Sequence, residues 1–403
     1  MEETIRTGKV TIISRESDEP TLDISMLDEE LRRRGIETEV MTQLFTKDKS
    51  AGDLAGYLGT VAKQEAAILK SDVVVLDTYN IPVSMLPRIG RTKVIQMWHA
   101  LSAVKKFGWQ TVGSEDGTSE RTATLMRMHK GYDYVIAPSD VTADIFAEAF
   151  RTDRSKIVKL GLPRIDYINS AVRGDARFKT FGAIYALYPE LAKSDDKKIV
   201  LYVPTFRKDG MPDIKGLAAA LDPEKYVMIV SLHPLYRSEE ELPQADNIIY
   251  EEEMSSFDLL GVADIIISDY SSMVVEATLA DKPLYLYTYD IDQYSETTGL
   301  NMDFDSEAIG KYVFRDAAEL AKSMAEPYDM EALRSFRDKY IEVNTENCTG
   351  QLADFIQSLL PERSADSLQK EAEPEQEQPE ESDTEPSIPT GLKEEKKDWY
   401  EHN

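Results

Sequence analysis

Cysteine, histidine and long hydrophobic runs are all scarce in this chain of 403 residues. The single cysteine, Cys348, cannot form a disulfide within the chain, so nothing in the sequence requires an oxidising compartment. No apolar run approaches the ~20 residues that span a bilayer. The first residues, MEETIRTGK, lack the apolar centre of a signal peptide. We therefore expect a cytoplasmic protein without a transmembrane helix.

Several common binding motifs are also missing. The sequence has neither a P-loop nor a Gly-rich dinucleotide fingerprint, and no residues with convincing metal-ligand spacing. We therefore expect no metal and no other cofactor. The net charge of −28 argues against nucleic acid as a partner, because phosphates would be repelled.

The negative charge is unevenly distributed. Residues 362–403 contain 14 acidic and 5 basic residues, and this Pro-punctuated tail has almost nothing to bury, so we expect it to be disordered. Between Leu86 and Arg164, 13 basic residues outnumber 8 acidic ones. Such a basic region can meet an anionic substrate or a lipid surface, although a chance clustering of solvated side chains explains it as well.

Short apolar runs alternate with amphipathic segments along most of the chain, which predicts an α/β protein with doubly wound parallel sheets. Two such halves are expected from the length. Strands are predicted at 9–14, 37–41, 73–76, 93–97, 134–137 and 157–160, and then at 198–203, 226–232, 247–250, 263–268 and 284–287. The domains expected are 1–165, a helical connection at 166–194, a second domain at 195–345, a helix at 346–361 that packs back on the first, and the tail.

The stretch from Ala263 to Tyr294 contains a strand, the turn S-D-Y-S-S, a helix to about Leu279, and a second strand after Lys282-Pro283. The start of a helix presents free backbone N–H groups and a positive dipole end, which favour phosphate. An ordinary turn whose serines only cap the helix is the alternative.

Five motifs together resemble the CDP-glycerol glycerophosphotransferase family of bacterial teichoic acid enzymes. Besides S-D-Y-S-S they are M-W-H followed by K-K-F-G, G-L-P-R-I-D, P-T-F-R and H-P. The resemblance runs from about Ser14 to Leu360. It implies a GT-B fold, in which two α/β domains face a cleft. It also implies transfer of glycerol phosphate or ribitol phosphate from CDP-glycerol or CDP-ribitol to a polymer hydroxyl, with release of CMP.

Two of the four histidines, His99 and His233, directly follow predicted strands, one in each half, so both can line one cleft. A structural interpretation remains for His129 and His402. In the resembling family the W-H and H-P histidines are both functional. This implies that His99 is the base, and that His233 holds the diphosphate or protonates the leaving oxygen.

The remaining candidates would bind substrate. Arg207 can grip a phosphate with two N–H groups, and Ser271 and Ser272 would complete a phosphate cradle. Asp269 either contacts the substrate or braces the turn. Glu276 either reaches the nucleotide ribose, as acidic residues at this point commonly do in GT-B transferases, or is a plain exposed glutamate.

Lys105 and Lys106 either face the polyanionic polymer or are solvated helix residues. Asp290 and Tyr294 are expected to contact the polyol or to close the cleft. Where relatives typically have W-H-G-T-P-L-K, this chain has W-H-A-L-S-A-V-K-K. Ala100 and Ser102 therefore change the surroundings of His99, which leaves the identity of the acceptor open.

The expected enzyme is a CDP-polyol phosphotransferase, peripheral on the inner leaflet of the cell membrane, with a lipid-linked polyol-phosphate polymer as acceptor. Two alternatives remain at this level. One is a GT-B glycosyltransferase or epimerase that uses a sugar nucleotide, and the other is a degenerate relative that only binds polymer as a scaffold.

Overall fold

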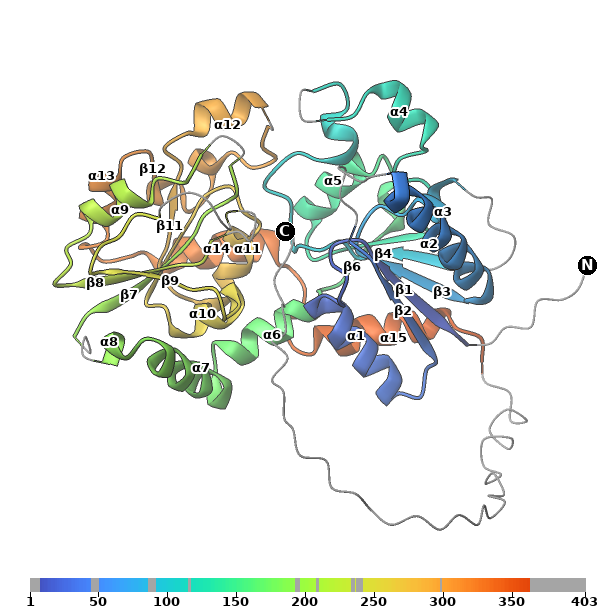
Figure 1. The fold of residues 1–403 in the computed structure, drawn as a ribbon, viewed down its shortest axis with the longest axis horizontal. Coiled ribbons are helices and arrows are strands. Elements are labelled where there is room, and N and C mark those ends of the chain that lie inside the picture. Colours follow the sequence, from blue (N-terminus) through green and yellow to red (C-terminus); the bar gives the residue numbers. More distant parts are fainter. Residues whose placement is uncertain are drawn as a thin grey trace, which may run out of the picture.

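Two parallel six-stranded sheets form the centre of the molecule (Figure 1). They belong to a computed structural model that describes residues 8–44, 51–85, 92–114, 117–192, 196–207, 210–232, 236, 242–297 and 299–362. The N-terminal sheet has the order β2-β1-β3-β4-β5-β6 and the C-terminal sheet the order β12-β11-β10-β7-β8-β9. This confirms the expected fold class, with two doubly wound α/β halves.

The strands lie where β-branched runs predicted them, to within two residues. The first sheet consists of β1 (Val10–Ser14), β2 (Thr38–Thr42), β3 (Val73–Leu76), β4 (Lys93–Gln96), β5 (Tyr134–Ala137) and β6 (Ile157–Lys159). The second consists of β7 (Lys198–Val203), β8 (Tyr226–Val230), β9 (Ile248–Tyr250), β10 (Ile265–Ser268), β11 (Leu284–Tyr287) and β12 (Val313–Phe314). Only β12 was missed, because two residues carry no readable pattern. Central strands such as β3 and β10 are buried along their whole length, since helices cover both faces of such sheets.

Helices cover these sheets and connect them (Figure 1). In the N-terminal half they are α1 (Leu22–Arg33), α2 (Ala51–Lys70), α3 (Ile81–Met85), α4 (Glu120–Leu125) and α5 (Asp140–Ala149). The connection consists of α6 (Pro163–Ala171), α7 (Gly174–Leu187) and α8 (Pro189–Ala192). In the C-terminal half they are α9 (Ile214–Ala220), α10 (Ser256–Val262), α11 (Met273–Glu276), α12 (Ile291–Thr297), α13 (Ala317–Ser323) and α14 (Met330–Tyr340), before α15 (Cys348–Leu359).

The last helix, α15, returns to the N-terminal half and lies beside α1 (Figure 1). Arg34, at the end of α1, donates from Nη2 to the carbonyl of Gly350 (3.0 Å). The carboxylate of Asp166 in α6 accepts from the main-chain N–H groups of Cys348 and Thr349 (2.8 and 2.7 Å), so it satisfies the start of α15. The exact domain limits stay predictions, and residues 363–403 of the expected acidic tail lie outside the described residues.

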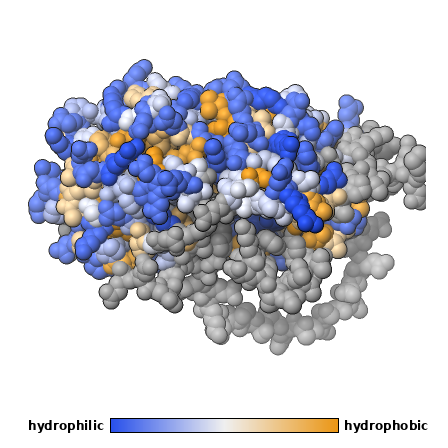
Figure 2. All heavy atoms as spheres, turned by 90° about the horizontal axis from the view of Figure 1, so that it is seen from above, coloured by the Kyte–Doolittle hydropathy of each residue, from blue (hydrophilic) through white to orange (hydrophobic). Residues whose placement is uncertain are grey.

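The molecular surface seen from above is mainly hydrophilic, with hydrophobic residues in small separate patches (Figure 2). Among the described residues, no helix combines the length and the hydrophobicity needed to cross a membrane.

Candidate functional site

The carboxyl ends of the two sheets meet at a buried contact between the halves. Glu276, which follows β10, accepts a hydrogen bond through Oε1 from the main-chain N–H of Leu101, which follows β4 (3.1 Å). The same oxygen lies 3.2 Å from Nη1 of Arg164 in α6, and Arg164 also donates from Nε to Asp23 in α1 (2.8 Å). Because all three charged side chains are buried, each neutralises a neighbour that would otherwise be costly to bury.

A second contact holds the same N-terminal segment a few residues further along. Asn301 donates from its side-chain amide to the carbonyls of Ala103 and Lys105 (3.2 and 3.0 Å). The main-chain N–H of Lys106 donates to the carbonyl of Gly299 (3.1 Å). Residues 101–106 are therefore fixed at both ends by the C-terminal half.

An unusual backbone conformation places His99 just before this segment. Trp98 has a φ of +60°, which is rare for a bulky residue and is typical of strained functional positions. Its N–H donates to Oε1 of Gln96 (2.8 Å), and its ring stacks on Phe107 with 4.5 Å between centroids. Nδ1 of His99 lies 3.1 Å from the main-chain carbonyl of Asp77, so this nitrogen carries the hydrogen when the ring is neutral and Nε2 is left free.

Acidic groups surround this imidazole. Oε1 of Glu16 lies 3.7 Å from Nδ1 of His99. Asp77, which directly follows β3, is 1% exposed, and burial raises the pKa of its carboxyl to about 7, with a smaller opposing effect of His99. Burial lowers the pKa of His99, although the charge of Asp77 opposes this. His99 is therefore neutral at pH 7 and can accept a proton.

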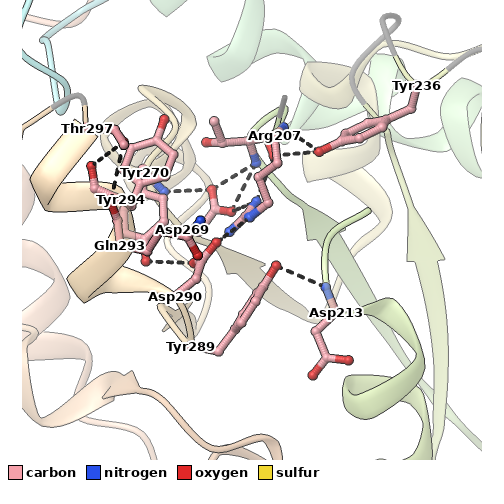
Figure 3. A network of polar contacts seen from close by, with 11 residues as sticks. Arg207, Asp213, Tyr236, Asp269, Tyr270, Tyr289, Asp290, Gln293, Tyr294 and Thr297 are labelled. Carbon is pink, nitrogen blue, oxygen red and sulfur yellow. Dashed lines mark hydrogen bonds and ion pairs between the residues drawn. The ribbon is translucent and has the colours of Figure 1, made fainter. Parts of the chain in front are cut away.

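At the end of the second sheet, Arg207 is the centre of a network of carboxylates and tyrosines (Figure 3). Its Nε and Nη2 donate to the two oxygens of Asp290 (2.6 and 3.1 Å). Its Nη1 donates to Asp269 (2.8 Å) and to the carbonyl of Thr205 (2.7 Å). The hydroxyl of Tyr270 also donates to Asp290 (3.0 Å). Desolvation disfavours the charged form of Arg207, but the hydrogen bond to Asp290 and the charge of Asp269 outweigh it, so its pKa is raised.

The two predicted candidates beside Arg207 have structural partners of their own. Asp269 is fully buried and also accepts from the main-chain N–H groups of Thr205 and Tyr270 (2.9 and 2.6 Å), so it braces the turn. The ring of Tyr294 stacks on Tyr270 with 4.1 Å between centroids. The Arg207 network is thus built before any substrate arrives.

Lys105 connects the two sheet ends. It forms an antiparallel bridge with Leu300, so the alternative of a solvated helix residue is wrong for it. Burial lowers the pKa of Lys105, and the charges of Asp269 (which raises it) and Arg207 (which lowers it) both act on the amine. Within the described part of the chain, the amine has no ion-pair partner. The side chain of Lys106 lies against Gly299 instead.

The serine turn after β10 differs from the expected cradle. The helix α11 has only four residues and continues as a 3₁₀ turn over Ala277–Ala280. Oγ of Ser271 accepts from the N–H of Met273 (3.2 Å), while Ser272 occupies the cap position without a side-chain hydrogen bond. Glu276 is 1% exposed, so the alternative of a plain exposed glutamate is wrong. His233 lies outside the described residues.

The substitutions in W-H-A-L-S-A affect packing beneath the segment. Ala100 and Ser102 are both buried, and Oγ of Ser102 accepts from the Thr142 hydroxyl (3.0 Å). The departure from the family pattern thus lies under the segment, on the side that faces α5.

Sequence reasoning missed four charged residues of this site: Glu16, Asp23, Asp77 and Arg164. A usable signal existed for three of them. Glu16 and Asp77 come at the carboxyl ends of predicted strands, as His99 does, and Arg164 lies in the G-L-P-R-I-D motif. Asp23 lies inside α1, where a polar residue in a helix carries no such signal.

Known proteins resemble this chain in sequence and in fold. Residues 1–358 match the family described as CDP-glycerol:poly(glycerophosphate) glycerophosphotransferase. A teichoic acid ribitol-phosphate primase of Bacillus spizizenii is 31% identical over 332 residues, which cover 79% of this chain and 84% of that protein. A teichoic acid glycerol-phosphate primase of Bacillus subtilis is 29% identical, over 73% of this chain and 75% of that protein.

Among solved structures, the wall teichoic acid polymerase TagF aligns with a TM-score of 0.67 and 18% identity, over 91% of this chain and 90% of that one. A TagF variant soaked with CDPG aligns with a TM-score of 0.66 and 19% identity, over 89% of this chain and 90% of that one. A putative UDP-N-acetylglucosamine 2-epimerase from Listeria monocytogenes aligns with a TM-score of 0.54 and 12% identity, over 91% and 97%. These structures share the fold. Because the family match extends through both halves and includes every motif described above, the chain belongs to the CDP-glycerol:poly(glycerophosphate) glycerophosphotransferase family.

Proposed function

We propose that this protein transfers glycerol phosphate or ribitol phosphate from its CDP ester to a hydroxyl group of a lipid-linked teichoic acid or similar polymer, and releases CMP. Family membership supports this, as do relatives named for both polyols and the CDPG-soaked TagF. The observation that carries it is the segment 99–106. It bears a neutral imidazole at one end and, at the other, the half-buried amine of Lys105. This amine has no ion-pair partner among the described residues, and the charges of Arg207 and Asp269 act on it.

In the proposed reaction, Nε2 of His99 takes the proton of the acceptor hydroxyl while that oxygen attacks the phosphorus that bears the polyol. A new P–O bond forms and the bond to the CMP oxygen breaks. Negative charge spreads over the phosphoryl oxygens in such a transition state. Lys105 would pair with phosphate oxygens of the bound donor and of the transition state alike, and His233 would hold the diphosphate or protonate the leaving oxygen.

Arg207 enters this scheme under one condition. Its Nε and Nη2 are both engaged by Asp290, so a bidentate grip on phosphate requires that the donor displace Asp290. The freed carboxylate and the neighbouring Tyr294 would then be available to the polyol hydroxyls. A ribose contact by Glu276 could use Oε2, which has no hydrogen-bond partner among the described residues, but it requires that the donor reach a carboxylate that is buried between the halves.

We further propose that Ser271 and Ser272 bind the donor phosphates, and that Lys106 lies along the polymer path. No metal or other cofactor is assigned a role, since cationic side chains can supply the compensating charge. The enzyme is proposed to be cytoplasmic and peripheral on the inner leaflet, where the basic region between 86 and 164 would meet anionic lipid.

The test uses radiolabelled CDP-glycerol and CDP-ribitol with a lipid-linked acceptor, and measures CMP and labelled polymer. We expect one donor to be consumed only in the presence of acceptor. UDP-sugars serve as the comparison. If neither CDP-polyol yields CMP, or if a uridine nucleotide binds in preference to a cytidine one, the proposal fails in favour of a sugar-nucleotide enzyme or a binding scaffold.

A further inference from the structure

Asp77 is a buried titratable residue that the reaction scheme above does not use. It directly follows β3, in the middle of the N-terminal sheet. Within the described part of the chain, neither of its carboxylate oxygens makes a hydrogen bond of good geometry, although the side chains of Ser14 and Thr78 lie close enough to oppose the rise of its pKa. Nearly all buried polar groups in proteins are hydrogen-bonded, so an exception of this kind requires an explanation.

The main chain of Asp77 already acts on His99. Its carbonyl oxygen lies 3.1 Å from Nδ1 of the imidazole, which leaves Nε2 as the proton acceptor. The parallel pairing of β3 with β4 fixes this arrangement, since Leu76 is opposite Gln96 and the N–H of Met97 donates to the carbonyl of Leu76 (2.7 Å). The two residues therefore follow neighbouring strands at the same edge.

The side chain of Asp77 acts on the same ring through its charge. The two groups influence each other in both directions: the charge of Asp77 favours the protonated imidazole, and His99 favours the ionised carboxylate. A carboxylate buried without partners is poorly stabilised. It therefore gains most when a positive charge develops beside it.

We infer that Asp77 is a positioning residue for His99: its carbonyl selects the tautomer that leaves Nε2 free, and its carboxylate compensates the charge that the ring gains on taking a proton. This inference rests on the proposed role of His99 as the base. The proton moves from the acceptor oxygen to Nε2, and Nδ1 keeps its hydrogen bond throughout. The ring becomes an imidazolium, whose positive charge the Asp77 carboxylate favours.

Other charged groups also face the ring. Glu16, after β1, lies 3.7 Å from Nδ1, and it raises the pKa of Asp77 by like-charge repulsion. Asp23 of α1 raises the pKa of His99 and Arg164 of α6 lowers it. These two are paired with each other, so their effects on His99 oppose one another, which leaves Asp77 and Glu16 as the groups that can be varied separately.

The first experiment compares wild type with Asp77→Asn, which keeps the shape and the carbonyl but removes the charge. We expect kcat for CMP release to fall by about 10²-fold, with KM for the CDP-polyol and for the acceptor within about twofold of wild type. Glu37→Gln is the control, because it removes an equal charge from a side chain that is 65% exposed. In a His99→Gln background, Asp77→Asn should reduce kcat no further, since residues that act as a unit are not additive.

A second experiment does not depend on activity. The chain has only four histidines, so ¹⁵N-imidazole NMR can follow His99 individually, with His99→Gln to assign its signal. Asp77→Asn should lower the pKa of His99, because it removes a negative charge that favours the protonated ring. Glu16→Gln gives a second variant, in which the acid limb of kcat against pH should move to lower pH.

The outcomes separate the two proposals. A wild-type protein that releases no CMP from any CDP-polyol contradicts the proposed function, while the NMR titration still decides whether Asp77 and His99 are coupled. An unchanged pKa of His99 in Asp77→Asn overturns the inference. So does a raised KM for the acceptor at unchanged kcat, which would mean that Asp77 binds substrate directly.

Discussion

Arg207, at the carboxyl end of the C-terminal sheet, and Asp77, at the carboxyl end of the N-terminal sheet, are in opposite states. In the C-terminal half, Arg207 donates to Asp269, Asp290 and a main-chain carbonyl, so each charge has partners. In the N-terminal half, the carboxylate of Asp77 is buried without a hydrogen bond of good geometry among the described residues. A network whose polar groups are all hydrogen-bonded keeps a fixed geometry. A buried carboxylate that lacks such bonds can instead interact with a positive charge that develops on a neighbouring side chain. We therefore expect the C-terminal end to hold substrate and the N-terminal end to perform the proton transfer.

The largest effect is expected from His99→Gln. Because the proposed base is lost, kcat for CMP release should fall by about 10² to 10⁴-fold, while the stability of the fold changes little. The measurement combines the rate assay with thermal unfolding of both proteins. If His99→Gln retains the wild-type kcat, the proton transfer does not take place at the N-terminal sheet, and the proposed division of roles between the two halves is wrong.

Arg207→Met tests the satisfied end. It leaves the fully buried Asp269 and the half-buried Asp290 without their common partner, which should lower the free energy of unfolding by about 3–5 kcal/mol. Urea unfolding measures this. The matched control is Arg334→Met, since Arg334 and Asp281 form an exposed pair, 47% and 42% accessible, that should contribute no more than ~1 kcal/mol. An equal decrease in the free energy of unfolding in the two variants would show that the Arg207 network stabilises the fold no more than an exposed ion pair does.

Lys105→Met tests the connection between the two ends. We expect KM for the CDP-polyol to rise about tenfold, which corresponds to roughly 1.4 kcal/mol of lost binding free energy. The fold should be equally stable or more stable, because burial already disfavours the charged amine. Lys322→Met, on the exposed side of α13, should leave both quantities unchanged. If KM stays constant in Lys105→Met as well, the amine does not meet the donor.

The smallest effect concerns His129, which serves structure in the same half as His99. Its Nδ1 lies 3.0 Å from the hydroxyl of Tyr132, and burial lowers its pKa from 6.5 to about 3. In the unfolded chain His129 therefore binds a proton below pH 6.5, whereas in the folded chain it does so only below about pH 3. Wild type should lose stability on acidification across this window, by at most ~1.4 kcal/mol per pH unit.

His129→Phe removes that dependence, so the difference in unfolding free energy between variant and wild type should shift in favour of the variant as pH falls from 6.5 to 5. The raised pKa of Asp77 has the opposite effect, because its contribution to the free energy of unfolding increases as pH falls below 7. Asp77 is present in both proteins, so this contribution cancels in the difference between them. A difference that stays constant with pH would mean that His129 titrates normally in the fold.

Much of the fold could be predicted because its strands are short and buried on both faces. β3 and β10 are runs of β-branched residues that fit little else, and all the predicted strands lie within two residues of their observed limits. The expected helix after Ser272 did not continue regularly, because the chain tightens to a 3₁₀ turn and Asp281 adopts a left-handed conformation, with φ +52°. Local sequence gives no warning of such tightening.

The site was predicted less completely, for a related reason. His99 and Arg207 stood out because they follow strands inside recognisable motifs. Lys105 seemed compatible with a solvated helix, since only contacts from Leu300 and Asn301, almost 200 residues later, hold it in an extended segment. Asp77 looked like an ordinary residue after a strand, because neither its burial nor its lack of partners is visible in the chain itself.

The sequence by itself determined the family, the two parallel sheets and the edge at which each polar candidate would emerge. These follow from periodicity and from motifs that lie within a few residues of one another. Only the tertiary structure decided which of these groups are neutralised and which are left unpaired. Burial and ion pairing depend on the distance between residues that are far apart along the chain, and the packing of the two halves sets that distance.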